Sequence, residues 1–416
     1  MRAKTIFSAL PLLIFVIVSV NLMSQPNVNL HDIKFVNSTT ATLVGEDGII
    51  LKTTNLGQSW ETQNSGITNV LYGYSPLDEN TALACGENGI ILKTVDGGIT
   101  WNLITTPTYE HLMDVEFINS ETALACGDNG TILYSDDGGE SWELVNNVTG
   151  NNLKDIDFYD EYIGYIVGAS GTLLRTNDGG RSFTAMDLSF SNADLNTVQA
   201  LANKIIVAGD YQAIFISDNG GQSWHSPNSL FTQNHVYDIR LFNGNDGILV
   251  GENGMIMRTM NGGLSWYSSF VNISTPGTDF YSVSFADANN GICIGKNGTE
   301  VYTTDGGITW SENAMLNPED PFISKATINL NNYPNPFNPS TVISYKITDN
   351  NSQVTLKIYD ITGKQISVLY DGLQNAGVYN VKFDGNGLSS GTYFYKLTVN
   401  YGKDTYSEVK KMVLAK

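Results

Sequence analysis

Hydrophobic residues along most of the chain occur in short runs that either alternate with polar residues or are uninterrupted. The segment from 112 to 145 shows the pattern, with apolar stretches at 112–117, 123–126, 131–134 and 142–145. Alternation is typical of half-buried strands, and short continuous runs are typical of buried ones. The 41 glycines supply turns between them. The pattern therefore predicts an all-β chain of many short strands.

A repeated phrase divides this pattern into seven units. Each unit ends on a turn sequence that closes with an aromatic residue, and these aromatic residues recur at intervals of 41, 41, 41, 41, 42 and 44 residues. They are Trp60, Trp101, Trp142, Phe183, Trp224, Trp266 and Trp310. Four predicted strands in about 40 residues is the size of a propeller blade. The sequence predicts a seven-bladed β-propeller over residues 25–316.

The units are in phase with whole blades, so the spacing indicates no strand exchange between the first blade and the last. We expect closure of the ring to depend on packing of the first blade against the seventh. Residues 25–29 or 311–316 are the segments expected to add a strand there.

The closing phrase, Thr/Ser-x-Asp-x-Gly-x-Ser/Thr-Trp, resembles the Asp-box or BNR repeat of sialidases, sortilin-type receptors and photosystem II assembly and stability factors. Over residues 30–316 the resemblance is best to the last family. In this motif the short acidic or amide side chain can accept hydrogen bonds from backbone N–H groups of its own turn. The matching positions are Asn55, Asp96, Asp137, Asp178, Asn219, Asn261 and Asp305. Because they recur in every unit, we predict a structural role for them and no catalytic one.

The composition changes after Trp310. Residues 317–326 read as a linker, and residues 327–416 hold about seven further predicted strands. These strands are expected at 328–330, 341–347, 354–359, 365–369, 377–383, 391–398 and 407–414. Such a set is enough for a small immunoglobulin-like β-sandwich.

Four ordered motifs in this second domain resemble the type A sorting domain of the type IX secretion system. The residues that carry the resemblance are Pro334, Asn335, Pro336, Phe337, Asn338, Pro339, Gly363, Gly391, Lys410 and Lys411. The resemblance implies transfer across the outer membrane by the type IX machinery. A sortase-like protease would then remove the domain, and the protein would be anchored at the surface or released. A fibronectin-like module is the alternative.

The N-terminus has the order of a secretory signal. Basic residues precede an apolar run from Ile6 to Val20, and a polar exit follows. We expect a signal peptide at 1–24 with cleavage near Ser24, and an uncleaved anchor is the alternative. No other stretch reaches the 18 or more apolar residues of a membrane helix. No transmembrane span is therefore expected once the signal is removed.

Charge is distributed unevenly between the two predicted domains. Residues 25–321 carry 36 acidic and 10 basic residues, a net charge of −26, whereas residues 322–416 carry 6 and 10, a net of +4. The acidic domain should be repelled by nucleic acid and by anionic lipid. We therefore expect neither of them as a partner.

Asp32, Asp114, Asp155 and Asp238 occupy matching positions near the start of four innermost strands. They are candidates to line one mouth of the channel and to bind a cation or a basic peptide. The simpler interpretation is that polar residues at strand starts face a solvated channel.

Enzymatic alternatives find little support in the sequence. A propeller glycoside hydrolase would need a carboxylate pair, for which the chain has many acids. The four histidines have no metal-site spacing, and no nucleotide or phosphate motif is present. We therefore expect no metal and no cofactor. The main prediction is an exported, non-enzymatic binding protein, on the cell surface or released, whose propeller binds a protein or glycan. A polysaccharide hydrolase and an assembly factor like the photosystem II family are the alternatives.

Overall fold

The structure is a computed structural model, and it describes residues 27–146, 148–188, 191–227, 234–242, 244–312, 330–347, 351–362, 364–401 and 404–415. The expected signal segment 1–24, the linker 317–326 and Gly363 lie outside these residues. The chain divides between Ala314 and Met315 into two compact units. In the part of the chain that is described, no helix is long and apolar enough to cross a bilayer.

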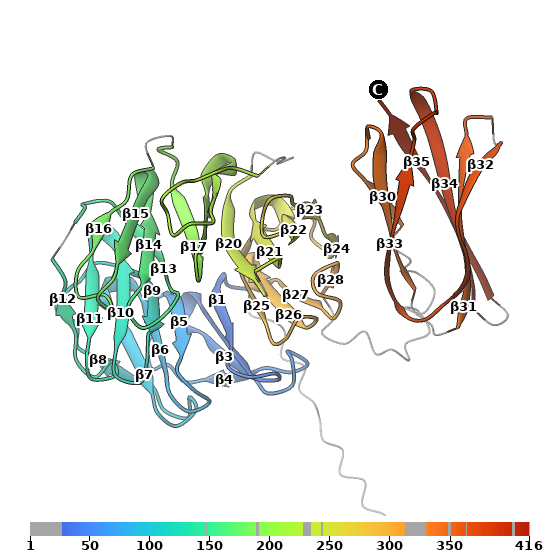
Figure 1. The fold of residues 1–416 in the computed structure, drawn as a ribbon. Coiled ribbons are helices and arrows are strands. Elements are labelled where there is room, and N and C mark those ends of the chain that lie inside the picture. Colours follow the sequence, from blue (N-terminus) through green and yellow to red (C-terminus); the bar gives the residue numbers. More distant parts are fainter. Residues whose placement is uncertain are drawn as a thin grey trace, which may run out of the picture. The chain divides into compact units, whose positions relative to one another are not determined.

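The first unit consists of seven sheets arranged around a common centre, in which consecutive strands of a blade pair antiparallel (Figure 1). The innermost strands are β1 (Leu30–Phe35), β5 (Leu71–Pro76), β9 (Leu112–Phe117), β13 (Leu153–Phe158), β17 (Leu195–Leu201), β20 (Val236–Leu241) and β25 (Phe280–Phe285). The second strands are β2 (Ala41–Gly45), β6 (Ala82–Gly86), β10 (Ala123–Gly127), β14 (Gly164–Gly168), β18 (Lys204–Gly209), β21 (Asp246–Gly251) and β26 (Gly291–Gly295). The predicted seven-bladed propeller is confirmed.

The outer half of each blade contains shorter strands. The third strands are β3 (Ile50–Thr53), β7 (Ile91–Thr94), β11 (Ile132–Ser135), β15 (Thr172–Thr176), β19 (Ile214–Ser217), β22 (Ile256–Met260) and β27 (Glu300–Thr303). The outermost are β4 (Glu61–Gln63), β8 (Asn102–Ile104), β12 (Glu143–Leu144), β16 (Thr184–Ala185), β23 (Tyr267–Ser268) and β28 (Thr309–Ser311). The described residues of the fifth blade form three named strands, followed by an isolated bridge between Ile216 and His225.

The hydrophobic cores lie between neighbouring blades. Leu83 and Cys85 of the second blade pack with Leu112 and Leu133 of the third. The second strand of a blade is consequently buried on both faces, which explains its uninterrupted apolar sequence. The cysteines at 85, 126 and 293 are buried free thiols, and burial raises the pKa of each thiol.

The ring closes by packing of the first blade against the seventh, without exchange of a blade strand. Leu43 of the first blade and Ile292 of the seventh share one core. The strand added to the seventh blade is β24 (Phe270–Asn272), which pairs in parallel with β28. Of the segments expected to add a strand, residues 27–29 form none, and residues 25–26 and 313–316 lie outside the described residues. The added strand comes from the connection between the sixth and seventh blades, whose length allows it to reach the outer edge of the sheet.

A short 3-10 turn joins the second and third strands of every blade. These turns are η1 (Glu46–Gly48), η2 (Glu87–Gly89), η3 (Asp128–Gly130), η4 (Ala169–Gly171), η5 (Asp210–Gln212), η6 (Glu252–Gly254) and η7 (Lys296–Gly298). In η2 the backbone reverses through Asn88 at φ 59° and Gly89 at φ 71°. Because Leu71 pairs with Gly86, the turns lie at the end of the channel where the inner strands start. The Asp-box turns join third and fourth strands and so lie at the opposite end.

The second unit is a β-sandwich, as predicted. One sheet has the order β29 (Asn331–Tyr333), β30 (Ser340–Ile347) and β33 (Gly377–Asp384). The other has the order β32 (Gln365–Gln374), β31 (Ser352–Asp360), β34 (Gly391–Tyr401) and β35 (Asp404–Leu414). The leading strand of the described residues is β29, in which Asn331 to Tyr333 pair with Ser344 to Val342 of β30. Residues 328–329 of the predicted strand 328–330 lie outside the described residues. Leu330 is buried in the core of the sandwich.

Candidate functional site

The Asp-box side chains all make the same local contact. In each of the seven turns the carboxylate or amide Oδ1 accepts the backbone N–H of the residue four positions later, at 2.9–3.0 Å. The Thr or Ser that precedes it by two residues accepts a glycine N–H at 2.8–3.0 Å. Of the closing aromatic residues, Trp142, Phe183, Trp266 and Trp310 are buried. Trp60, Trp101 and Trp224 are half-buried. The geometry supports a turn-stabilising role.

Replacement of Asp305 by alanine is expected to lower the free energy of unfolding by about 1–2 kcal/mol, because its turn loses backbone and hydroxyl hydrogen bonds. Asp305→Asn should lower the free energy of unfolding much less, since Asn55 and Asn219 accept the same backbone hydrogen bond in their own turns. Thermal or denaturant unfolding of the two variants checks the difference. Equal destabilisation by alanine and asparagine would contradict the hydrogen-bond explanation.

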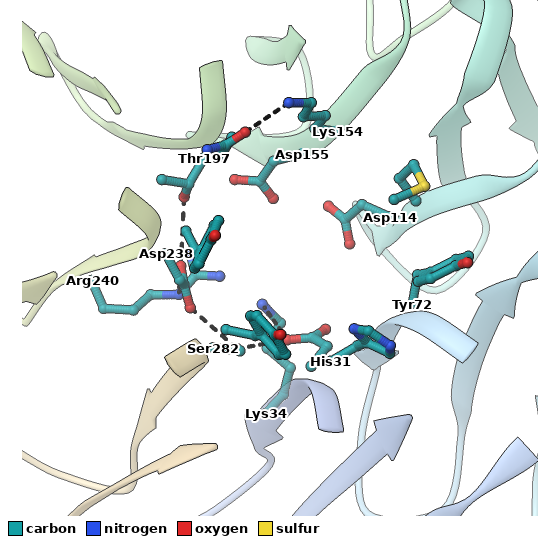
Figure 2. Close-up of a pocket in the computed structure, with 15 residues that line it drawn as sticks. His31, Lys34, Tyr72, Asp114, Lys154, Asp155, Thr197, Asp238, Arg240 and Ser282 are labelled. Atoms are coloured by element: carbon teal, nitrogen blue, oxygen red, sulfur yellow. Dashed lines mark hydrogen bonds and ion pairs between the residues drawn. The ribbon is translucent and has the colours of Figure 1, made fainter. Parts of the chain in front are cut away.

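The four predicted channel aspartates come together in one pocket, at the end of the channel where the inner strands start (Figure 2). They occupy the third position of their strands, where the other three blades have Gly73, Thr197 and Ser282. The pocket has a volume of about 100 Å³. Asp32 and Asp238 are buried, and Asp114 and Asp155 are half-buried. The aspartates thus lie together in the channel wall at this end, where two are buried and two are half-buried.

Each of these aspartates bonds to the next blade. Asp32 Oδ2 accepts the N–H of Tyr74 at 3.0 Å, and Asp114 Oδ2 accepts that of Ile156 at 2.9 Å. Asp155 and Asp238 accept the N–H groups of Val198 and Val283 at 2.7 and 2.9 Å. An acceptor for a buried N–H contributes to stability, so these carboxyls connect blades as well as lining the channel.

At three blade junctions no aspartate of this group accepts a backbone N–H, and the residue two positions further along an inner strand does so instead. Ser75 Oγ accepts the N–H of Phe117 at 2.9 Å, and Gln199 Oε1 that of Leu241 at 2.6 Å. Ser284 Oγ accepts the N–H of Phe35 at 3.0 Å, which bridges the seventh blade to the first. At every blade junction, therefore, a backbone N–H of the next blade donates a hydrogen bond to a channel side chain.

Two cations compensate part of this negative charge. Lys34 Nζ lies 3.5 Å from Asp32 Oδ1, and Arg240 Nε lies 3.7 Å from Asp238 Oδ1. Both come from the strand position two residues beyond the aspartate, so they point to the same side as their partner. Burial opposes the charged form of Arg240, but the surrounding aspartates outweigh this and raise its pKa.

The other channel carboxyls hold their protons more tightly than usual. Burial, followed by repulsion from Asp155, raises the pKa of Asp114 well above its usual range. Burial also raises the pKa of Asp155, although Arg240 and Lys34 oppose it, and raises that of Asp157 to about 7. Glu116 has a strongly raised pKa for the same reason, and its buried Oε2 has no hydrogen-bond partner in the described structure. The channel therefore disfavours the ionised form of these four carboxyls.

Aromatic rings form an arc around the mouth of this pocket. Along the arc, successive ring centroids are 6.5, 5.2, 5.7, 5.5, 6.4 and 4.8 Å apart. The rings belong, in order, to His111, Tyr72, His31, Tyr281, Tyr237, His235 and Tyr211, and we call them the aromatic arc. Lys154, which donates to Asp194 at 3.1 Å and Asn196 at 2.8 Å, lies on the side of the mouth that the arc leaves open.

Sequence reasoning found the aspartates and missed the arc. The signal was present, because four of the rings directly precede the third strand position, at residues 31, 72, 237 and 281. Alignment of the inner strands by this third position would have placed these four rings at one level of the channel. The other three rings come from turns and connections, and only the folded structure brings them to the mouth.

The sorting motif of the second unit is folded into its sandwich. Asn335 accepts the N–H of Val413 at 2.8 Å and donates to the carbonyl of Lys411 at 3.2 Å. Phe337 is buried and forms a bridge with Leu414 of the last strand. Lys410 Nζ donates to Asn331 at 3.0 Å. The motif and the C-terminal strand thus form one structural element.

Family models match parts of both units. Residues 141–228 and 225–333 match the family profile of the photosynthesis system II assembly factor YCF48, and residues 133–144 match the BNR/Asp-box repeat. Residues 331–415 match the secretion system C-terminal sorting domain. No curated protein sequence matches the chain.

Several solved structures share the fold at low sequence identity. YCF48 bound to a D1 peptide is 18% identical with a TM-score of 0.56, over 67% of this chain and 92% of that one. The GH74 enzyme of Niastella koreensis is 15% identical with a TM-score of 0.58, over 93% and 73%. PorZ, a surface component of the type IX secretion system of Porphyromonas gingivalis, is 14% identical with a TM-score of 0.55, over 92% and 59%. The resemblances to an Asp-box propeller of the YCF48 type and to a type IX sorting domain are confirmed.

Proposed function

We propose that the protein is a non-enzymatic binding protein. It joins an Asp-box propeller of the YCF48 type to a type IX sorting domain, and it is therefore exported to the cell surface or beyond. The channel mouth at the inner-strand starts is its binding site. The observation that carries this proposal is the aromatic arc above a polar pocket. Exposed aromatic rings beside a few fixed polar groups are typical of recognition sites.

A polysaccharide hydrolase is the second candidate, since a GH74 enzyme shares the fold. Hydrolysis requires two carboxyls that are free to act as acid and as base or nucleophile on an exposed bond. Each channel aspartate already accepts a backbone N–H of the next blade, in a pocket of about 100 Å³. Release of reducing ends from a polysaccharide panel, lost on mutation of Asp32, Asp114, Asp155 or Asp238, would instead support the hydrolase.

A photo-crosslinking amino acid in place of Tyr72 is expected to give a discrete adduct with the partner on cells that export the protein. The reason is that this position lies in the aromatic arc at the proposed binding site. The control is the same residue at Ile99, which is 81% exposed in an Asp-box turn at the opposite end of the channel. Adducts are separated by electrophoresis and identified by mass spectrometry. The absence of an adduct at Tyr72, or the same adducts in equal yield at both positions, would overturn the assignment of the mouth as the binding site.

A further inference from the structure

The channel mouth has the chemistry of a site for one positively charged side chain. We propose that it receives a lysine or arginine presented by a partner protein, an inference that rests on the proposed function of the mouth. The cation lies against the blade 1 to 3 part of the aromatic arc, formed by His31, Tyr72 and His111, and faces the channel carboxyls below. Figure 2 shows His31 and Tyr72 beside the open centre into which Asp114 and Asp155 point.

The rings in this part of the arc are uncharged. The Nδ1 atom of His111 accepts the backbone N–H of Asn88 at 3.1 Å, which requires an unprotonated nitrogen. Burial lowers the pKa of His31, although Glu46 and Asp32 oppose this. Neutral aromatic faces attract cations, and Tyr72 lies between the two histidines.

The turns around Tyr72 carry three acids that have no basic partner in the described structure, although Glu46 and Glu87 accept hydrogen bonds from Asn29 and Val70. Glu46, Glu87 and Asp128 come from the η turns of the first three blades, and within the described residues none of them forms an ion pair. Burial and these three carboxylates together raise the pKa of the Tyr72 hydroxyl. On the other side of the mouth, by contrast, Asp210 pairs with His235 at 2.7 Å and Asp279 with Lys296 at 3.6 Å. The blade 1 to 3 side is therefore the part of the mouth that attracts a cation.

The channel below contains more carboxyl groups than cations. Its inner strands carry six carboxyl residues, at 32, 114, 116, 155, 157 and 238, against Lys34 and Arg240 within the channel and Lys154 at its mouth. Glu116 lies two residues after Asp114, so its side chain points to the same side of the strand, and its buried Oε2 has no partner among the described residues. An ammonium or guanidinium group placed beside these carboxyls would favour their ionised form and be stabilised by it.

The size of the pocket favours one side chain over a glycan segment. Its volume is about 100 Å³. Pockets that enclose whole small ligands measure roughly 300–1,000 Å³, whereas one water needs roughly 10–15 Å³. The tip of a long side chain fits this space, and its peptide backbone would remain outside at the arc.

Capped Gly/Ser peptides that differ only in one central residue test the proposal against the full-length protein. Peptides with arginine or lysine are expected to bind at least about tenfold more tightly than those with norleucine or glutamate, and more weakly as salt rises. Tyr72→Ala and Asp114→Asn should reduce this preference, whereas Tyr72→Phe retains the ring and should preserve it. Asp136→Asn, an exposed acid at the opposite end of the channel, is the matched control. Thermal unfolding verifies that each variant is folded.

Equal binding of the norleucine and lysine peptides, or absence of binding by all of them, would overturn the cation site. An equal loss in Asp136→Asn would also overturn it. If Asp114→Asn does not fold, the comparison of Tyr72→Ala with Tyr72→Phe still decides. A crosslinked adduct at Tyr72 without any preference for cationic peptides would leave the mouth as the binding site and refute only its selectivity for a cation.

Discussion

Deletion of residues 327–416 is expected to abolish surface display and leave the propeller in the periplasm. The reason is that the type IX sorting domain lies within this segment, while the propeller is a separate compact unit with its own cores. The measurement is the amount of propeller on intact cells by antibody labelling and protease digestion, compared with the periplasmic fraction. The deletion removes the whole sandwich because Asn335 and Phe337 are bound to the terminal strand, and a partial deletion would leave an unfolded remnant.

Full-length protein with Asp136→Asn is the control, since this exposed acid lies in the propeller and far in sequence from the sorting motif. Fusion of residues 327–416 to an unrelated periplasmic domain provides the converse measurement and should bring that domain to the surface. Normal surface display of the truncated chain would show that another segment directs export.

The stability of the propeller is expected to fall as pH rises from about 5 to about 8, and Glu300→Gln is expected to reduce this fall. Glu300 stands where the other third strands have Ile50, Ile91, Ile132, Leu173, Ile214 and Ile256. Its Oε2 accepts the Nε1–H of Trp60 at 2.9 Å and the hydroxyl of Tyr302. Its Oε1 is buried and has no partner among the described residues. A carboxyl therefore lies in the core that joins the last blade to the first.

Burial raises the pKa of Glu300 to about 7, although Tyr302 and Trp60 oppose the rise. Between its unfolded pKa and this value the folded protein holds the proton and the unfolded chain has released it. Unfolding then releases a proton, so the free energy of unfolding falls as pH rises through this window. The loss is complete above pH 7 and amounts to about 3 kcal/mol.

Denaturant unfolding at several pH values measures the effect. The channel carboxyls Asp155 and Asp157 also have raised pKa values and add to the same trend, so the informative quantity is the difference between wild type and Glu300→Gln. Glu61→Gln, at an exposed position of β4, is the control. The same pH dependence in wild type and Glu300→Gln would exclude ionisation of Glu300 as a cause.

The contacts that could not be predicted from the sequence share a physical origin. The repeat predicted the blades because each blade is formed by consecutive strands and fastened by bonds between residues four apart, as between Asp305 and Thr309. The pairing of the strand added to the seventh blade could not be predicted from local pattern, because its partner, Thr309 to Ser311, lies some forty residues further along the chain. The aspartates were predicted as a group, but their bonds to the next blade were not.

The sequence by itself determined the all-β architecture, the number of blades, the Asp-box turns and the sorting domain, because these depend on local patterns repeated within about 40 residues. Only the tertiary structure decided what the channel aspartates contact, since Asp32 and its donor Tyr74 are 42 residues apart. It also decided that rings from six blades form one arc, because such contacts depend on the closure of the ring. The mouth of the channel is therefore a property of the closed propeller and of no single repeat.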